Sequence, residues 1–329
     1  MKNIAIKGIS VSLGSNREGN ELLEHKHPDW NIDRIAARTG IEQRFLAEDG
    51  ETGFDLALKA TERLFRDYEL SPTEIDAVIF CTQSPDYRIP GNASLLHGKF
   101  ELRSDVAAFD INLACSGFPY GLAIARGLFA SGLAKNILFA TADTYSKFIN
   151  EEDRATRVLF GDGATATWLG ASESSSRIID VSLGSDGSGY EAFYVPSGAC
   201  RELQGDASDS KIQMSGRDIL KFTYSTIPDH IDEFLEKNSV SYDDIDLFIF
   251  HQASALVLDS LTTKLDLEEQ KVYRNLKDTG RLWRSTEEKA RIQNEFAQAV
   301  MALTAECPAS DPTPQDVENA VLLNGAWRS

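Results

Sequence analysis

The sequence contains no apolar run of the roughly 20 residues that a membrane-spanning helix requires. Residues 1–11 alternate like a strand, whereas a secretory signal peptide has an unbroken apolar core. Cysteine is sparse: Cys81, Cys115, Cys200 and Cys307 are far apart and form no Cys-x-x-Cys pair. This spacing suits neither a disulfide framework nor a zinc site. We therefore expect a reduced cytoplasmic protein without a bound metal.

Positive charge is also scarce. The 33 Lys and Arg residues are outnumbered by 51 Asp and Glu, which gives a formal net charge of −18 at pH 7. This balance argues against binding nucleic acid, whose phosphates must be neutralised by cations, and against docking on an anionic membrane surface. A negatively charged substrate would need basic residues gathered locally. The 329 residues, 42% of them hydrophobic, are enough for two domains or one large layered unit.

An internal repeat divides the chain. Residues 71–84 and 241–254 are 170 positions apart, and six of their 14 positions are identical. The identical pairs are Ser71/Ser241, Ile75/Ile245, Asp76/Asp246, Ile79/Ile249, Phe80/Phe250 and Ser84/Ser254. Each copy follows a stretch with apolar residues at helical spacing (54–65 and 227–235) and runs into a short apolar strand (77–80 and 247–250). The alternative is a chance likeness between two common helix–strand connections. The repeat favours a duplicated α/β fold with one mixed sheet in each half.

We expect the halves to span about residues 1–170 and 171–329. Ligands of such folds bind beyond the strand ends, near the junction of the halves. The residues that leave the two repeated strands, Cys81–Thr82 and His251–Gln252, are therefore expected in related positions there.

Cys115 is the candidate nucleophile. An apolar strand begins near Val106, meets a run of small residues at 114–117, and gives way to a helix expected over 120–131. A thiol at such a turn points at free helix N–H groups and at the positive end of the helix dipole, and both favour the thiolate. The alternative interpretation is a buried structural cysteine.

His251 is the candidate second catalytic group, because histidine is the usual partner of a thiolate or of a developing oxyanion. Alone, a histidine at a strand end is more often structural. The glycine cluster Phe160–Ala164 is not a dinucleotide fingerprint, since no third glycine follows at the required spacing. It predicts a tight turn before a strand at 165–169.

Four blocks in matching order resemble the β-ketoacyl-acyl-carrier-protein synthase III family of the thiolase superfamily. They are Arg38–Arg44 (Arg-Thr-Gly-Ile-x-x-Arg), Asp110–Phe118 around Cys115, Phe160–Ala164 (Phe-Gly-Asp-Gly-Ala) and His251–Ser254 (His-Gln-Ala-Ser). The resemblance runs from about residue 1 to about residue 280. It implies a five-layered α-β-α-β-α thiolase-like fold made of two duplicated halves, usually as a homodimer.

The resemblance also implies a role for each matched residue. Cys115 would be acylated, and its backbone N–H would contribute to an oxyanion hole. His251 would belong to the pair that stabilises the enolate formed when a malonyl thioester loses CO₂. Coenzyme A or the phosphopantetheine of an acyl carrier protein would carry the acyl group, with no permanently bound cofactor.

Two departures from the family pattern concern the carrier and the third catalytic residue. Where the family has a tryptophan that stacks on adenine, this chain has Arg34; the second adenine-stacking residue is matched by Arg154. Where the family has its catalytic asparagine, this chain has Arg281, and everything beyond is unlike the family. A frame change or a replaced terminus would each explain this. Residues 321–323 resemble a remnant strand, and Asn324 is a weak candidate substitute.

Three functions remain open from the sequence, and a Cys–His hydrolase is a weaker fourth, since the duplicated half-chain pattern does not belong to papain-like proteases. The first is decarboxylative condensation, and the second is acyl transfer from Cys115 to an alcohol or amine, which needs no enolate stabilisation. The third is a catalytically impaired paralogue that binds thioesters. The acyl chain length and the pathway cannot be derived. Because acyl carrier proteins are acidic, docking one would need a local basic face, and the candidates for this face are Arg34, Arg38, Arg154 and Arg157.

Overall fold

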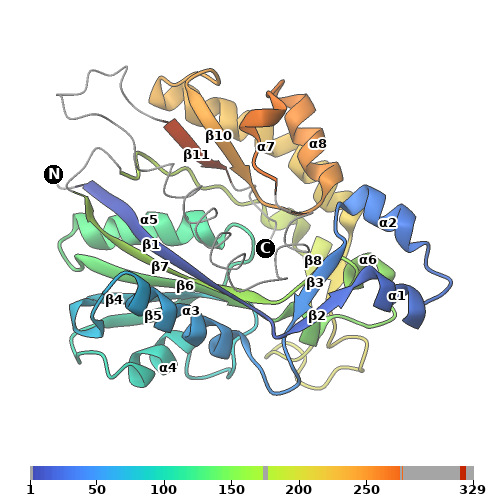
Figure 1. Ribbon diagram of the computed structural model, residues 1–329, viewed down its shortest axis with the longest axis horizontal. Helices are drawn as coiled ribbons and strands as arrows, with labels where there is room; N and C mark the ends of the chain where they lie inside the picture. Colours follow the sequence, from blue (N-terminus) through green and yellow to red (C-terminus); the bar gives the residue numbers. More distant parts are fainter. Residues whose placement is uncertain (1–2, 173–176, 275, 277–318, 324–329) are drawn as a thin grey trace.

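The computed structural model describes residues 3–172, 177–274, 276 and 319–323. Its largest feature is a five-stranded mixed sheet with the order β1-β7-β6-β4-β5 (Figure 1). The strands are β1 (Asn3–Leu13), β4 (Ala77–Cys81), β5 (Ala107–Ile111), β6 (Asn136–Asp143) and β7 (Gly163–Ser172). Strand β4 runs parallel to both β5 and β6, whereas β7 is antiparallel to β6 and β1.

The central strands are apolar along their length because helices cover both faces of this sheet. Val78 and Phe80 of β4 pack in one core with helices α3 (Gly53–Asp67) and α4 (Asn92–Lys99). Ala77 and Ile79 point to the other face, where they pack with α5 (Gly117–Ala130). The alternation of side chains along a strand thus divides β4 between two cores.

Local sequence explains where the covering helices begin and how closely they pack. Helix α3 starts at a capping box, in which the Thr52 side chain accepts from the Asp55 backbone N–H and the Asp55 carboxylate accepts from that of Thr52. Helix α5 begins at Gly117, three residues earlier than the sequence predicts. A Cβ on Gly121 would lie 2.1 Å from the Phe139 ring, so a glycine is required where α5 crosses β6.

The second half repeats the first. Helix α7 (Gly216–Asn238) leads to β10 (Ile245–Phe250), and α8 (Ala255–Lys264) follows. Strand β10 pairs in parallel with β11 (Asn319–Leu323), as β4 does with β6, and Phe248 forms a parallel bridge with Val272 on its other side. The loops before β4 and β10 also match, because Ser71 N–H donates to the Glu74 carboxylate and Ser241 N–H donates to that of Asp244. The duplication and the strand at 321–323 are confirmed.

Figure 1 shows the elements in layers. Helices α3 and α4 lie below the first sheet, α5 lies above it, β10 and β11 follow, and α7 and α8 lie on the far side. The first sheet ends at Ser172, two residues past the expected boundary of the halves; the division at 170/171 itself stays a prediction. No helix among the described residues combines the length and the hydrophobicity needed to cross a bilayer.

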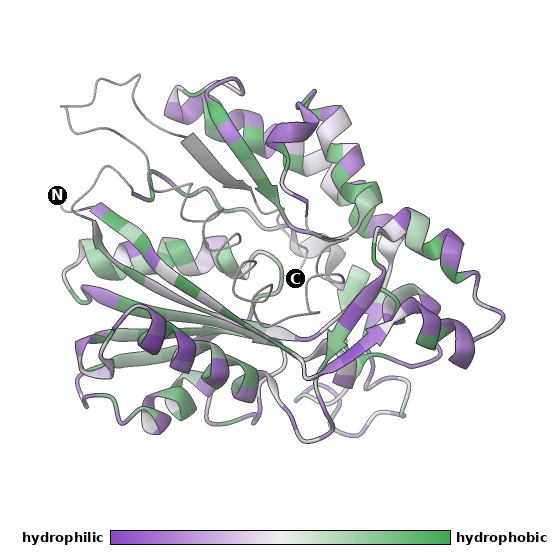
Figure 2. Ribbon diagram, in the orientation of Figure 1, coloured by the Kyte–Doolittle hydropathy of each residue, from purple (hydrophilic) through white to green (hydrophobic). Residues whose placement is uncertain are grey.

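Short elements complete the fold at the end of the sheets. They are β2 (Asn16–Gly19), α1 (Asn20–Lys26), α2 (Ile32–Thr39), β3 (Gln43–Leu46), the 3₁₀ helices η1 (Pro72–Glu74), η2 (Tyr145–Phe148), η3 (Gly187–Ala192) and η4 (Glu269–Lys271), α6 (Arg154–Arg157), β8 (Phe193–Tyr194) and β9 (Gln213–Met214). Figure 2 shows the contrast: the strands of the first sheet are largely green, whereas β2 and β3 are mostly purple.

Candidate active site

A cavity of about 270 Å³ lies where the two halves meet, and both candidate catalytic residues line it. The first half contributes Cys115 from the loop after β5 and Gln83 from the loop after β4. The second half contributes His251 and Gln252, which follow β10 directly. The structure therefore brings together two residues that are 136 positions apart in the sequence (251 − 115).

Cys115 lies two residues before the first residue of α5, at the strand-to-helix turn that the sequence predicts. A Cβ on Gly117 would be only 2.3 Å from the Cys81 sulfur, so this turn tolerates no larger residue there. The Cys81 thiol in turn donates to the Leu113 carbonyl at 3.2 Å. The sequence predicts Cys81 near the site. The structure shows that it holds the loop that carries Cys115 and does not line the cavity.

The expected thiolate is not what the electrostatics favour. Burial, together with the nearby Asp143 carboxylate, raises the pKa of Cys115 to about 12, and the hydrogen bond from its own backbone only partly opposes this. Desolvation of the thiol is the largest cause, and it acts against the helix N-terminus on which the expected thiolate depends. Burial and the Asp143 carboxylate both favour the protonated thiol of Cys115 near pH 7.

His251 is uncharged near pH 7, because burial lowers its pKa to about 4. The loop that carries it is held by Gln252, whose Nε2 donates to the Phe250 carbonyl at 2.9 Å and to the Tyr273 carbonyl at 3.2 Å. A neutral imidazole can accept a proton from a thiol or donate its single N–H to an oxyanion. Both roles suit a residue that shares a cavity with Cys115.

Asp143 organises the loop after β4. Its Oδ1 accepts from the Gln83 N–H at 2.8 Å, the Ser84 N–H at 3.1 Å, the Ser84 hydroxyl at 3.0 Å and the Thr82 hydroxyl at 3.2 Å. Burial raises the pKa of Asp143 to about 6, although these hydrogen bonds oppose the increase. Sequence analysis missed Asp143 and Gln83. Their position at the ends of neighbouring parallel strands is the signal that could have found them.

The arginines expected to hold the carrier lie away from the cavity. Arg34 and Arg38 are exposed one turn apart on α2, and Arg154 is exposed at the start of α6. None of the three lines the cavity. Their assignment to coenzyme A stays a prediction.

Arg157 does not belong to an exposed basic face, which corrects the sequence-based expectation. It is 4% exposed, and its guanidinium pairs with Glu18 at 2.7 Å. Arg44, the last residue of the Arg-Thr-Gly-Ile-x-x-Arg block, is also buried beside Glu18 at 3.6 Å, and burial lowers its pKa to about 10. This buried cluster joins β2, β3 and α6, and neither arginine lines the cavity.

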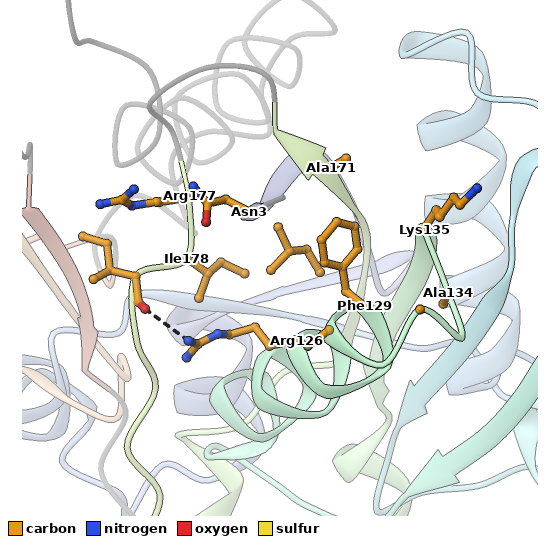
Figure 3. Close-up of a pocket in the computed structure, with 12 residues that line it drawn as sticks. Asn3, Arg126, Phe129, Ala134, Lys135, Ala171, Arg177 and Ile178 are labelled. Carbon is orange, nitrogen blue, oxygen red and sulfur yellow. Dashed lines mark hydrogen bonds between the residues drawn. The ribbon is translucent and has the colours of Figure 1, made fainter. Parts of the chain in front are cut away.

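A second cavity of about 560 Å³ lies at the far end of α5. Figure 3 shows Arg126, Lys135 and Arg177 around an apolar floor that includes Phe129 and Ile178. No cysteine or histidine lines it. Among the described residues there is also no group of three or more His, Cys, Asp or Glu side chains that could hold a metal ion.

The comparisons with known proteins agree with this geometry. Residues 109–187 match the family model described as 3-oxoacyl-[acyl-carrier-protein (ACP)] synthase III, and residues 235–286 match the C-terminal model of the same name. The β-ketoacyl-[acyl-carrier-protein] synthase III of Caldanaerobacter subterraneus is 37% identical over 259 residues, 78% of each chain. That of Clostridium perfringens is 36% identical over 283 residues, 85% of this chain and 86% of its own.

The chain belongs to the β-ketoacyl-acyl-carrier-protein synthase III family. Solved structures of family members have the same fold. A 3-oxoacyl-(acyl-carrier-protein) synthase III superposes with a TM-score of 0.78 at 35% identity, covering 82% of this chain and 85% of its own. The enzyme from Aquifex aeolicus superposes with a TM-score of 0.74 at 35% identity, covering 83% and 84%. The thiolase-like fold implied by the sequence resemblance is thus confirmed.

The family's third catalytic position lies outside the described residues. Arg281, which the resemblance assigns to this position, and Asn324, the weak candidate substitute, are both among the residues that the structure does not describe. Within the described residues, the candidate active site therefore consists of Cys115, His251 and the residues around them.

Proposed function

We propose that this chain is an acyl-thioester condensing enzyme of the 3-oxoacyl-acyl-carrier-protein synthase III type. The observation that supports this most strongly is that Cys115 and His251, one from each half, line the same cavity. In the first step the Cys115 sulfur attacks the carbonyl carbon of an acyl thioester. The thiol proton passes to the neutral imidazole of His251 and leaves with the carrier thiol, so that the acyl group is transferred to the enzyme.

In the second step a malonyl thioester loses CO₂. The electrons of the broken carbon–carbon bond form an enolate, whose oxygen accepts the N–H of neutral His251. The enolate carbon then attacks the acyl-Cys115 carbonyl and releases the Cys115 thiolate. The released thiolate takes up one proton from solvent, which balances the loss of the malonyl carboxylate as CO₂, and the raised pKa of Cys115 favours this return to the thiol. Since burial raises the pKa of the Cys115 thiol, its sulfur attacks as its proton passes to His251.

Coenzyme A or the phosphopantetheine of an acyl carrier protein carries the acyl group in this proposal. The exposed Arg34, Arg38 and Arg154 offer the local positive charge that an acidic carrier needs on a protein of net charge −18. A cytoplasmic homodimer without a permanent cofactor remains part of the proposal.

Arg281, in place of the family's asparagine, favours a second candidate: transfer of the acyl group from Cys115 to an alcohol or amine. Attack by such an acceptor needs a base but no enolate stabilisation. A thioester-binding paralogue with little activity is the third possibility.

Release of CO₂ from malonyl-acyl-carrier protein separates these functions. We expect the wild-type protein, supplied with an acyl-CoA, to release one CO₂ for each 3-oxoacyl product formed, and Cys115→Ala to form no product. Stable acylation of Cys115 without CO₂ release would contradict condensation and favour transfer. Absence of acylation with every thioester tested would contradict both enzymatic functions.

A further inference from the structure

Gln83 presents an amide to the active-site cavity on a rigid support. Its backbone N–H is bonded to Asp143 Oδ1, and the residues on either side, Thr82 and Ser84, donate to the same oxygen. Thr82 and Ser84 are each 4% exposed, whereas Gln83 is partly accessible and lines the cavity. The loop is therefore fixed by its buried neighbours while the Gln83 side chain faces the ligand space.

Tyr145 determines which end of this amide is available. Its hydroxyl donates to Gln83 Oε1 at 2.8 Å. The Tyr145 ring is held edge-on against Phe160 and Phe193, with ring centroids 5.5 and 5.9 Å away. With Oε1 engaged, the Nε2 group is left to donate, and it makes no hydrogen bond with the residues that the structure describes.

We propose that Gln83 is a catalytic residue that donates an Nε2–H hydrogen bond to the carbonyl oxygen of the malonyl thioester, and that Tyr145 is the positioning residue that fixes its amide. The inference rests on the proposed function. Negative charge develops on this oxygen as CO₂ leaves, and His251 offers it only one N–H from its neutral ring. A neutral amide suits this oxygen better than the malonyl carboxylate, since tight binding of the departing carboxylate would hold back its loss.

The raised pKa of Cys115 is consistent with an uncharged donor at this place. Desolvation already disfavours charge throughout the cavity, and an amide donates without adding an ion to it. Gln252, the other glutamine that lines the cavity, uses its Nε2 to hold the Phe250 and Tyr273 carbonyls. Of the two glutamines that line the cavity, Gln83 is thus the one whose Nε2 makes no hydrogen bond with the described residues.

The test compares Gln83→Leu, Gln83→Glu and Tyr145→Phe with wild type in two assays. The first measures acyl transfer from acyl-CoA to Cys115 by intact mass, and the second measures CO₂ release from malonyl-acyl-carrier protein, with kcat and KM determined separately. We expect Gln83→Leu to lower kcat for CO₂ release by about 10²- to 10³-fold, the usual cost of losing one oxyanion donor. Acylation of Cys115 should change by less than about threefold.

Gln83→Glu replaces the amide donor while the size of the side chain stays almost unchanged. Once ionised, the introduced carboxylate still accepts from the Tyr145 hydroxyl but cannot donate, so at pH values above its pKa this variant should match or exceed the loss in Gln83→Leu. It also decides the question if Gln83→Leu fails to fold. Tyr145→Phe should lower kcat by about tenfold, and the double variant should be no slower than Gln83→Leu alone, because the two residues act through one hydrogen bond. Gln204→Leu, at an exposed position, is the control.

Equal CO₂ release by wild type and the two Gln83 variants would overturn the inference while leaving the proposed function intact. An equal loss of acylation and CO₂ release would also overturn it, because it would show a role in folding or in the first step. A wild-type protein that acylates Cys115 but releases no CO₂ would overturn the condensing function and, with it, this role of Gln83.

Discussion

The two copies of the repeat reach the same local structure but differ in how they are supported. In the first copy β4 is paired over five residues with β5 on one side and with β6 on the other. In the second copy the described residues pair β10 with β11 on one side and, at the single bridge Phe248–Val272, on the other. The local sequence specifies that a strand forms, whereas the strands that pair with it determine how stable it is.

The two halves contribute different parts of the candidate active site. The nucleophile loop, with Cys115, and the Gln83 loop both extend from the fully paired sheet. His251 extends from the second copy. In the proposed reaction the first half would hold the attacking sulfur, and the second half would supply the imidazole that receives its proton.

The largest effect on stability is expected at Phe80 and Phe250, which are identical residues at matched positions of β4 and β10. Their side chains are 0% and 3% exposed. We expect Phe80→Ala to reduce the free energy of unfolding by about 3–5 kcal/mol, because the fully paired β4 cannot collapse into the cavity left behind. Phe250→Ala should cost less, about 3 kcal/mol, because Phe250 is the last residue of β10 and lies where the strand gives way to a loop that can adjust.

Urea unfolding of the two variants, with the slope m compared to wild type, measures these losses. The exposed residue Leu133, 74% exposed, provides a control: Leu133→Ala should change stability by less than about 0.5 kcal/mol. A loss in Phe250→Ala equal to or larger than that in Phe80→Ala would contradict the asymmetry.

Asp76 and Asp246 allow a smaller and more specific test. Asp76 Oδ2 accepts from the backbone N–H groups of Lys135 at 2.8 Å and Asn136 at 3.0 Å, and its Oδ1 accepts from Arg103 at 3.0 Å. Asp246 is exposed and lies at the register shift between β10 and β11. We expect Asp76→Ala to cost about 1–3 kcal/mol and Asp246→Ala less than about 0.5 kcal/mol.

The dependence on pH distinguishes this effect from a loss of packing. Burial tends to raise the pKa of Asp76, but the hydrogen bonds from Lys135, Asn136 and Arg103 outweigh it and lower the pKa. A carboxyl with a lowered pKa in the folded state stabilises the fold fully above its unfolded pKa of about 4 and loses this effect as pH falls through the folded value. The difference between wild type and Asp76→Ala should therefore shrink in acid. A difference that stays constant down to pH 3 would contradict the assignment.

Much of the fold could be predicted from the sequence. The identical pair Ile75/Ile245 and the serines at 71 and 241 are visible as a repeat because a loop and a buried strand impose the same local requirements twice. The strands that pair with β4 and β10 on either side could not be predicted, since pairing with distant segments such as β11 depends on the topology of the whole fold. The burial of Arg157 was missed for the same reason: its partner Glu18 is 139 residues away.

The candidate active site could likewise be predicted only in part from the sequence. Cys115 and His251 could be chosen from residue type and position at strand ends. The direction of the Cys115 pKa could not, because it depends on desolvation and on Asp143, which reaches the site from a neighbouring strand. Gln83 was missed because its proposed role depends on the hydrogen bond from the Tyr145 hydroxyl to its amide oxygen, and Tyr145 is 62 residues further along the chain.

Acylation of the protein is the measurement that tests the central claim most directly. The intact mass of the wild-type protein, after incubation with an acyl-CoA, should increase by one acyl group. Cys115→Ala should show no increase, whereas Cys200→Ala, at an exposed free cysteine, should be acylated as wild type is. An acyl adduct that persists in Cys115→Ala, or no adduct on the wild-type protein with any acyl thioester, would contradict the account.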